Sequence, residues 1–354
     1  MGDILHALPA VTALRQAHPE WHIGWVIEPR WQALLKAGNE GTSEQGNDRG
    51  PAQPVPAQSV IDRLHFAPTK QWAKRPLTLQ TFHELAALRR ELRACQYNAV
   101  VDFQGAIRSA VIARMAGAGR VIGEAEPRER PARWLFTQRI PTDGAHVIEQ
   151  DMELASAIAG DALRPVAPLL PTDPEAERWC NALLTADDNQ PVAEPIALIT
   201  PGAGWGAKRW PVERYAAVAA GLHSRGMRVL INAGPGEEPL ADAIRSASNL
   251  IATPVNASLN QLIALTRRIA LCIAGDTGPL HLACALGRPV VGIYGPTDPS
   301  RNGPYGTRSV VLRSPFSRRD HSRRAEPESG LLTISPEDVL QAADSLMAEE
   351  KRER

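Results

Sequence analysis

The chain has 354 residues and a mass of 38.3 kDa, which is too long for one small core and fits two domains. Lysine plus arginine and aspartate plus glutamate both total 39, and this balance excludes a protein that holds nucleic acid by bulk charge. No apolar run reaches 18 residues, and the first residues lack the basic and apolar regions of a signal peptide, so we expect a cytoplasmic protein. The four cysteines form no CxxC pair, which favours buried thiols.

The first half of the chain alternates short apolar runs, rich in β-branched residues, with helical patterns. Pro9 is a good first-turn residue and precedes a predicted helix over 10–17. The stretch 39–59 is Gly, Pro, Gln and Ser with almost no apolar content, which predicts a disordered surface insertion. The other predicted elements are strands over 22–28, 60–66, 99–103 and 120–123 and helices over 79–95, 107–116 and 146–159. This alternation is typical of a parallel α/β sheet.

The same alternation restarts after a proline-rich stretch over 164–171. It predicts strands over 196–200, 228–233, 269–274 and 289–294 and helices over 212–224, 237–246, 259–267 and 281–286. We therefore expect an N-terminal domain over 1–164, a linker and connecting helix over 165–195, a second domain over 196–334, and a C-terminal helix over 335–354. Ligands of such α/β folds bind at the carboxyl ends of the strands.

The strongest chemical signal is the turn that follows the predicted strand ending at 274. Gly275 and Gly278 let the backbone approach a ligand closely, and the helix that opens there presents N–H groups to an anion. Asp276 accepts and Thr277 donates hydrogen bonds, and His281 lies one turn further on the same face. The alternative is a capped turn with a core-facing histidine. A second turn over 295–299, on the same edge, weighs against that alternative.

A glycine-rich loop over 200–211 carries the second signal, Lys208. The chain has only five lysines, and Lys208 is the only one between 75 and 350. The loop is neither a Walker A motif, since GK[ST] is missing, nor a dinucleotide GxGxxG. Backbone N–H groups and one compact ammonium predict a diphosphate site. The alternative is a solvated lysine.

Asp3 lies at a glycine turn before the first predicted helix, where it either caps the helix or serves a site. Six basic residues are candidates for meeting an anionic acceptor, with ordinary solvated side chains as the alternative: Lys70, Lys74, Arg75, Arg128, Arg130 and Arg133. No His, Cys, Asp or Glu cluster has metal-ligand spacing, and no GxSxG or Cys–His nucleophile pattern is present.

Five segments together resemble the bacterial heptosyltransferases of lipopolysaccharide inner-core assembly, glycosyltransferase family 9. They are GDILHALPAVTALR (2–15), WVIEPRW (25–31), YNAVVDFQGAIRSA (97–110), TPGAGWGAKRWP (200–211) and GDTGPLHLACALGRPVVGIYGPTDP (275–299). The resemblance implies a GT-B fold, with two Rossmann-like domains facing across a cleft and a C-terminal helix that crosses back to the first domain. It also implies inverting transfer of heptose from ADP-L-glycero-D-manno-heptose to Kdo of Kdo-lipid A.

The resemblance also assigns roles to residues. It implies that Asp3 is the catalytic base and that Lys208 binds the donor diphosphate. Ala203 and Gly204 stand where relatives often have hydroxyl residues. The resemblance therefore implies contacts to the donor only from their backbone N–H groups. The other implied donor-binding residues are Glu237 at the ribose, Asp276, Thr277, Gly278 and His281. The acceptor is expected to meet Lys70, Lys74, Arg75, Arg128 and Arg130.

The chemistry of this transfer needs few protein groups. An ADP leaving group needs charge stabilisation more than protonation, and Lys208 with the helix N-terminus at Gly278 supplies it. The acceptor hydroxyl needs a base, which Asp3 provides. No DxD motif is present, so we expect no metal and no cofactor, with ADP-heptose as co-substrate. We expect a monomer, peripheral at the inner face of the inner membrane, with no nucleic-acid partner.

Two alternatives remain open at this point. One is a related heptosyltransferase with a different acceptor, and the other is a nucleotide-sugar-binding protein without turnover. The second is motivated by the start of the chain, because family members have a central strand before the glycine–aspartate turn, whereas Met1 directly precedes Gly2 here. We therefore expect that this first strand is missing, that Asp3 lies on a frayed terminus, and that the native start lies upstream.

Overall fold

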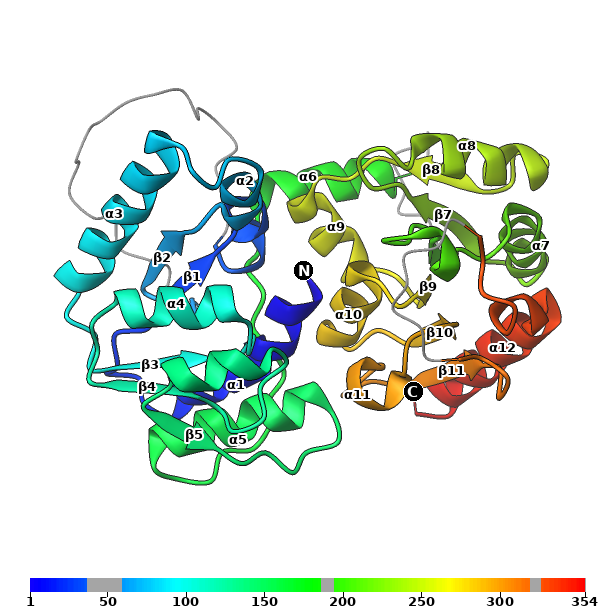
Figure 1. The fold of residues 1–354 in the computed structure, drawn as a ribbon. Helices are drawn as coiled ribbons and strands as arrows, with labels where there is room; N and C mark the ends of the chain where they lie inside the picture. Colours follow the sequence, from blue (N-terminus) through cyan, green and yellow to red (C-terminus); the bar gives the residue numbers. More distant parts are fainter. Residues whose placement is uncertain (37–58, 186–193, 319–325, 354) are drawn as a thin grey trace. The chain divides into compact units, whose positions relative to one another are not determined.

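The chain folds into two compact α/β units, of which unit 1 extends to Pro171 and unit 2 begins at Thr172 (Figure 1). The computed structural model describes residues 1–36, 59–185, 194–318 and 326–353. The predicted insertion over 39–59 lies outside the described residues, apart from Ser59. No helix among the described residues is long and apolar enough to cross a membrane.

Unit 2 contains one parallel six-stranded sheet of order β11-β10-β9-β6-β7-β8. Its strands are β6 (Ile196–Thr200), β7 (Arg228–Asn232), β8 (Thr253–Val255), β9 (Leu271–Gly275), β10 (Val290–Tyr294) and β11 (Ser309–Arg313). The apolar runs IALIT, LCIAG and VVGIY form β6, β9 and β10, which are buried along their whole length because helices cover both faces of the sheet. Thr200 pairs with Ala274 and Gly275 with Ile293, so the carboxyl ends of these strands lie at one edge.

Helices cover both faces of this sheet, with α7 and α12 on one face and α9 and α10 on the other (Figure 1). They are α6 (Pro174–Leu183), α7 (Val212–His223), α8 (Glu238–Ala247), α9 (Leu259–Thr266), α10 (Gly278–Ala285), α11 (Pro299–Asn302) and α12 (Pro336–Glu353), with short 3-10 turns η3 (Gly206–Lys208) and η4 (Leu331–Thr333). The short strands β8 and β11 and the short helix α11 were not predicted, whereas α6 lies within the linker and connecting helix expected over 165–195.

Two helices of unit 2 lie in segments that the sequence placed outside the second domain. Helix α6 falls in the expected linker, yet Asp173 at its N-cap accepts a hydrogen bond from Asn260 of α9 at 2.9 Å, so it is part of unit 2. Helix α12 was expected to return to the first domain. Its described side chains pack on α7 and the turn after it, where Leu340 lies against Gly221 and Asp344 pairs with Arg225.

Unit 1 contains two separate parallel sheets, β1-β2 and β3-β4-β5. The strands are β1 (Gly24–Ile27), β2 (Arg63–Phe66), β3 (Ala99–Asp102), β4 (Arg120–Glu124) and β5 (Gln138–Ile140). No described strand joins the two sheets, and β1 and β3 are only half-buried along most of their length.

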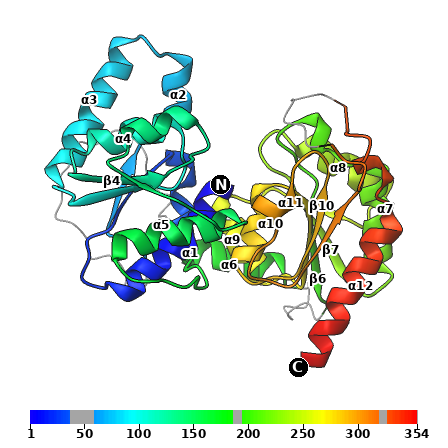
Figure 2. The same ribbon diagram turned by 60° about the horizontal axis from the view of Figure 1, so that its bottom comes forward.

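The helices of unit 1 are α1 (Gly2–Ala17), α2 (Thr69–Lys74), α3 (Leu79–Ala94), α4 (Ile107–Met115) and α5 (Val147–Ala159), with 3-10 turns η1 (Pro29–Leu34) and η2 (Arg130–Leu135). Figure 2 shows α1 and α5 on one side of β4 and α3 and α4 on the other. The predicted helices over 79–95, 107–116 and 146–159 match α3, α4 and α5 to within one residue at each end.

The first helix corrects two expectations. It begins at Gly2 rather than at Ala10, so Asp3 lies in its first turn and Pro9 lies inside it. An interior proline costs about 3 kcal/mol because it removes a backbone hydrogen bond. Burial of every residue from Leu5 to Leu14 offsets this cost, with Ala10 and Leu14 in one apolar cluster with α5. Asp3 is therefore part of a packed helix and does not lie on a frayed end.

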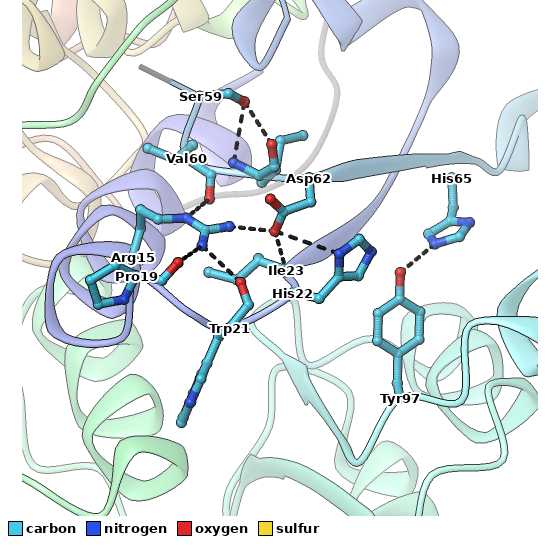
Figure 3. Close-up of polar contacts among 11 residues, drawn as sticks. Arg15, Pro19, Trp21, His22, Ile23, Ser59, Val60, Asp62, His65 and Tyr97 are labelled. Atoms are coloured by element: carbon cyan, nitrogen blue, oxygen red, sulfur yellow. Dashed lines mark hydrogen bonds and ion pairs between the residues drawn. The ribbon is translucent and has the colours of Figure 1, made fainter. Parts of the chain in front are cut away.

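The far end of α1 is fixed by a clamp around Arg15, shown in Figure 3. The guanidinium of Arg15 pairs with Asp62 and donates to the carbonyl oxygens of Trp21, at 2.7 Å, and Pro19, at 3.0 Å. Asp62 also accepts a hydrogen bond from the backbone N–H of Ile23 at 2.7 Å. These contacts tie the end of α1 to the segments that lead into β1 and β2.

A buried histidine joins β2 to the neighbouring elements (Figure 3). His65 Nδ1 lies 2.7 Å from Glu91 Oε1 on α3, and Nε2 lies 2.7 Å from the Tyr97 hydroxyl. A Cβ on Gly24 would lie 1.9 Å from that hydroxyl, so only glycine fits at the start of β1. Gly24 and Tyr97 lie at or just before the amino ends of β1 and β3, and His65 is the third residue of β2, so these contacts join β2 to α3 and to the segment that leads into β3.

Candidate functional site

Lys208, Asp276 and His281 meet at the carboxyl edge of the sheet in unit 2. Lys208 ends η3 after β6, and Asp276 follows β9 directly. The Lys208 ammonium lies 2.5 Å from Asp276 Oδ2, and His281 Nε2 lies 3.4 Å from Oδ1 of the same carboxylate. Trp205 stacks on the ammonium at 4.3 Å. The glycine-rich loop and the Gly275 turn, 68 residues apart, thus form one cluster of charges.

The charge of Asp276 is secured by its neighbours. Burial by itself raises the pKa of this carboxyl. The hydrogen bond with His281 and the Lys208 ammonium outweigh burial, and they hold the pKa of Asp276 well below its usual range. Asp276 therefore stays ionised at any pH near neutral, and the half-buried ammonium beside it keeps a fixed partner.

Helix α10 starts beside this cluster with its N-terminal N–H groups uncapped by a side chain. Thr277 is the N-cap residue, but its hydroxyl donates to the Gly275 carbonyl oxygen, at 3.3 Å, and does not cap the helix. Proline at the second helical position lacks an N–H group. The positive end of the helix dipole, with the N–H group of Gly278, is therefore available to an anion.

Glu237 lies beside Gly202 of the glycine-rich loop. It follows β7 and is the N-cap residue of α8. Its carboxylate accepts a hydrogen bond from the Gly234 N–H group at 3.0 Å and lies so close to Gly202 that a Cβ there would be 2.1 Å from Oε2. The carboxylate thus lies at the same sheet edge as Lys208, and Ala203 and Gly204 lie on the glycine-rich loop.

Three polar atoms that the sequence did not single out lie buried on loops or strand ends at this edge. They have no hydrogen-bond partner among the described residues, and they are Thr200 Oγ1, Trp205 Nε1 and Thr297 Oγ1. Such orphaned groups are costly in a folded protein unless a ligand or water completes them. Thr297 belongs to the turn over 295–299, which the sequence marked only as a turn.

The second group of candidate residues lies at the carboxyl edge of β3 in unit 1. Gln104 Nε2 donates a hydrogen bond to Asp3 Oδ2 at 3.0 Å, across 101 residues of chain. The other end of the same amide, Oε1, lies 3.5 Å from Nε of Arg108 on α4. Because Arg108 donates to the amide oxygen, the amide nitrogen is left facing Asp3. The sequence quoted Gln104 only within a motif and gave it no role.

Asp102 shapes the turn that carries Gln104. Its buried carboxylate accepts hydrogen bonds from the N–H groups of Gln104, at 2.9 Å, and Gly105, at 3.2 Å, and from the Ser109 hydroxyl at 2.8 Å. Burial raises the pKa of Asp102, and these hydrogen bonds offset only part of that rise. Gly105 has φ +61°, a left-handed conformation that favours glycine.

The predicted acceptor-binding residues lie on two segments of unit 1. Arg128 and Arg130 are exposed on a segment that packs against the Gly105 turn, where the Glu129 N–H group donates to the Gly105 carbonyl oxygen at 2.9 Å. Lys70 and Lys74 are exposed on α2. The structure gives the remaining two arginines acidic partners: Arg75 pairs with Glu84 at 2.9 Å, and Arg133 with Glu126 at 3.4 Å.

Arg30 is a further cation near α1 that the sequence did not single out. The pKa of the Met1 amino group is lowered to about 6, first by burial and then by Arg30 and Lys70, while Asp3 opposes the change. Arg30 and Lys70 therefore lie within electrostatic range of the first turn of α1. Among the described residues, no group of three or more His, Cys, Asp or Glu side chains is placed to hold a metal ion.

A family model described as glycosyltransferase family 9 (heptosyltransferase) matches residues 85–331, which is most of the chain. The match includes the three segments that carry the candidate residues after β3, β6 and β9. The chain belongs to glycosyltransferase family 9. It is an enzyme, a glycosyltransferase of the heptosyltransferase kind.

Relatives and solved structures agree with this assignment. Lipopolysaccharide heptosyltransferase 1 of Salmonella typhimurium is 27% identical over 89% of this chain and 92% of its own length. Lipopolysaccharide heptosyltransferase 3 of Escherichia coli is 24% identical over 98% of this chain and 96% of its own. The structure of E. coli heptosyltransferase WaaC with ADP superposes with a TM-score of 0.74, at 24% identity over 98% and 97% of the two chains, which shows a GT-B fold.

In this family 9 enzyme we expect Gln104 to be a positioning residue for Asp3. Replacing Gln104 by alanine removes the amide that orients the carboxylate, and kcat should fall about tenfold with an unchanged KM for the donor, the usual effect of one charge-assisted hydrogen bond. Steady-state rates of ADP release measure both quantities.

The matched control is Gln80→Ala, because the Gln80 amide also donates to a carboxylate, Glu84, at 3.1 Å on an exposed helix. Its kcat should equal that of the wild type. Equal rates for both variants and the wild type would show that Asp3 needs no partner.

Proposed function

We propose that the enzyme transfers heptose from ADP-L-glycero-D-manno-heptose to Kdo of Kdo-lipid A, with inversion at the anomeric carbon. The observation that carries the proposal is the pairing of Lys208 with Asp276 beside the uncapped N-terminus of α10. A fixed ammonium and free N–H groups at one sheet edge suit the diphosphate of a sugar nucleotide. The solved WaaC structure with ADP-2-deoxy-2-fluoro heptose supports a donor of this kind.

Unit 2 supplies the donor chemistry in this proposal. As the bond between the anomeric carbon and the β-phosphate oxygen breaks, negative charge grows on the leaving ADP. Lys208 and the start of α10 stabilise that charge without a proton transfer. Glu237 binds the ribose hydroxyls, the Ala203 and Gly204 N–H groups contact the diphosphate, and Thr277, Gly278 and His281 complete the donor site.

Unit 1 supplies the acceptor chemistry. A Kdo hydroxyl attacks the anomeric carbon, and Asp3 accepts its proton as the new glycosidic bond forms. Lys70, Lys74, Arg128 and Arg130 contact the carboxylate and phosphate groups of the acceptor, with a smaller part for Arg75 because Glu84 already balances its charge. Lys208 supplies the charge that a metal supplies in other transferases, so the reaction is proposed to need neither metal nor cofactor, and EDTA should not slow it.

A second acceptor remains a candidate, because relatives named heptosyltransferase 1 and heptosyltransferase 3 match the chain at similar identity. In that case the donor residues keep their roles, and an acceptor that already carries heptose replaces Kdo-lipid A. For either acceptor we propose a monomer that works in the cytoplasm, peripheral at the inner face of the inner membrane.

Incubation of the enzyme with ADP-heptose and each acceptor in turn tests the proposal by mass spectrometry. The expected result is a mass gain of one heptose on Kdo-lipid A and none on an acceptor that already carries its first heptose. The reverse pattern would favour the second candidate. Binding of ADP-heptose with no transfer to any acceptor would overturn the proposed reaction.

A further inference from the structure

Three apolar side chains on the connection between α2 and α3 and on the first turn of α3 face solvent. Leu77 is 86% exposed, Leu79 81% and Phe82 54%. We call these three residues the apolar tip. Figure 2 shows this connection at the end of unit 1 furthest from β4. Single exposed leucines are ordinary, but three strongly exposed large apolar residues within six positions mark a candidate interaction site.

The apolar tip is held in place by the packing beneath it. Glu84 on α3 accepts a hydrogen bond from Trp72 Nε1 of α2 at 2.7 Å and pairs with Arg75 at 2.9 Å. Thr78 caps α3 by accepting from the Thr81 N–H group, and the Thr81 hydroxyl donates to the Arg75 carbonyl oxygen at 2.8 Å. Little conformational freedom is therefore left to lose when the tip is buried by a partner.

The surroundings of the tip are cationic. Residues 69–95 contain six lysine or arginine residues and two glutamates, and Lys70, Lys74, Arg89 and Arg90 are exposed. Exposed apolar side chains on a cationic segment suit a bilayer with anionic headgroups, where the apolar groups enter the acyl boundary and nearby cations such as Lys74 stay with the phosphates. A protein partner of opposite charge would have to match both features at once.

We propose that the apolar tip is the membrane anchor of this enzyme, and that its partner is the surface of an anionic phospholipid bilayer. Leu77 and Leu79 insert below the headgroups, and Lys70 and Lys74 remain among the phosphates. The inference deepens the proposed function, since a lipid acceptor is met at a membrane. Membrane binding can be measured without acceptor and without sugar transfer. The membrane proposal and the proposed reaction can therefore fail separately.

The test is co-sedimentation of the whole chain with vesicles of phosphatidylethanolamine and phosphatidylglycerol, and with neutral vesicles of phosphatidylcholine. The wild type should bind the anionic vesicles more tightly. The double variant Leu77→Ser, Leu79→Ser should bind the anionic vesicles about tenfold or more weakly, because two apolar side chains no longer leave water. Its thermal unfolding midpoint and its affinity for ADP-heptose should not change, since both residues are exposed.

Matched controls are Leu250→Ser and Phe316→Ser, two apolar residues of unit 2 that are 65% and 81% exposed. Both should bind anionic vesicles like the wild type. The proposal is overturned if the tip variant binds as the wild type does, or if the controls lose as much binding as the tip variant. It is also overturned if light scattering finds a wild-type dimer that the tip variant dissociates, because the tip then meets a second copy.

Discussion

Replacing Asp3 by asparagine should lower kcat about 10²–10⁴-fold, the range expected when a positioned general base is removed. Asparagine has the same shape and can still accept the hydrogen bond from Gln104, so the geometry of the turn is kept. Only the ability to take the acceptor proton is lost. Because Asp3 is exposed, the free energy of unfolding should change by no more than about 0.5 kcal/mol.

Initial rates of ADP release with saturating Kdo-lipid A measure this effect. The control is Asp242→Asn, which changes another exposed aspartate in the first half of a helix, α8. It should leave kcat and donor affinity unchanged. A wild-type kcat for the Asp3 variant would show that another group takes the proton, and it would remove Asp3 from the proposed mechanism.

Replacing Lys208 by methionine should have two separate effects. The reaction should slow about 10²–10³-fold in kcat, because the charge on the departing ADP loses its main stabilising cation. The fold should also lose roughly 3 kcal/mol at neutral pH, because Asp276 becomes a largely buried carboxylate without its ammonium. Rates and urea unfolding measure the two effects on the same sample.

The stability effect has a defined pH dependence. The folded-state pKa of Asp276 lies below its unfolded value of about 3.9, so its ion pair stabilises the fold above that pH and the stabilisation is lost as the pH falls through the folded pKa. The difference between the methionine variant and the wild type should therefore shrink in acid. A difference that stays constant with pH would mean that the lost stability comes from packing.

Two further variants separate charge from structure. The double variant Lys208→Met, Asp276→Asn removes the uncompensated charge and should recover much of the lost stability, but none of the lost kcat. Lys36→Met, at an exposed lysine of unit 1, should be neutral in both measurements. Recovery of kcat in the double variant would show that Lys208 acts only by balancing Asp276.

The sequence by itself determined the four central strands of unit 2, β6, β7, β9 and β10, and the sheet edge at which their loops meet. Short apolar runs such as LCIAG and VVGIY predict strands that are covered on both faces of a sheet. A short turn that contains glycine follows each of them. Because parallel strands bring their carboxyl ends to one edge of a sheet, the sequence predicts that the loops carrying Lys208 and Asp276 lie close together. The scarcity of lysine added the chemical signal at Lys208.

Only the tertiary structure decided the features that depend on contacts between distant segments. The start of α1 at Gly2, despite Pro9, follows from burial against α5, which outweighs local propensity. Gln104 donates a hydrogen bond to Asp3, 101 residues away in the chain. Arg75, which the sequence predicted to bind the acceptor, forms an ion pair with Glu84. Local pattern sets which residues form helices and strands, whereas the partner of each polar side chain depends on the packing of those elements.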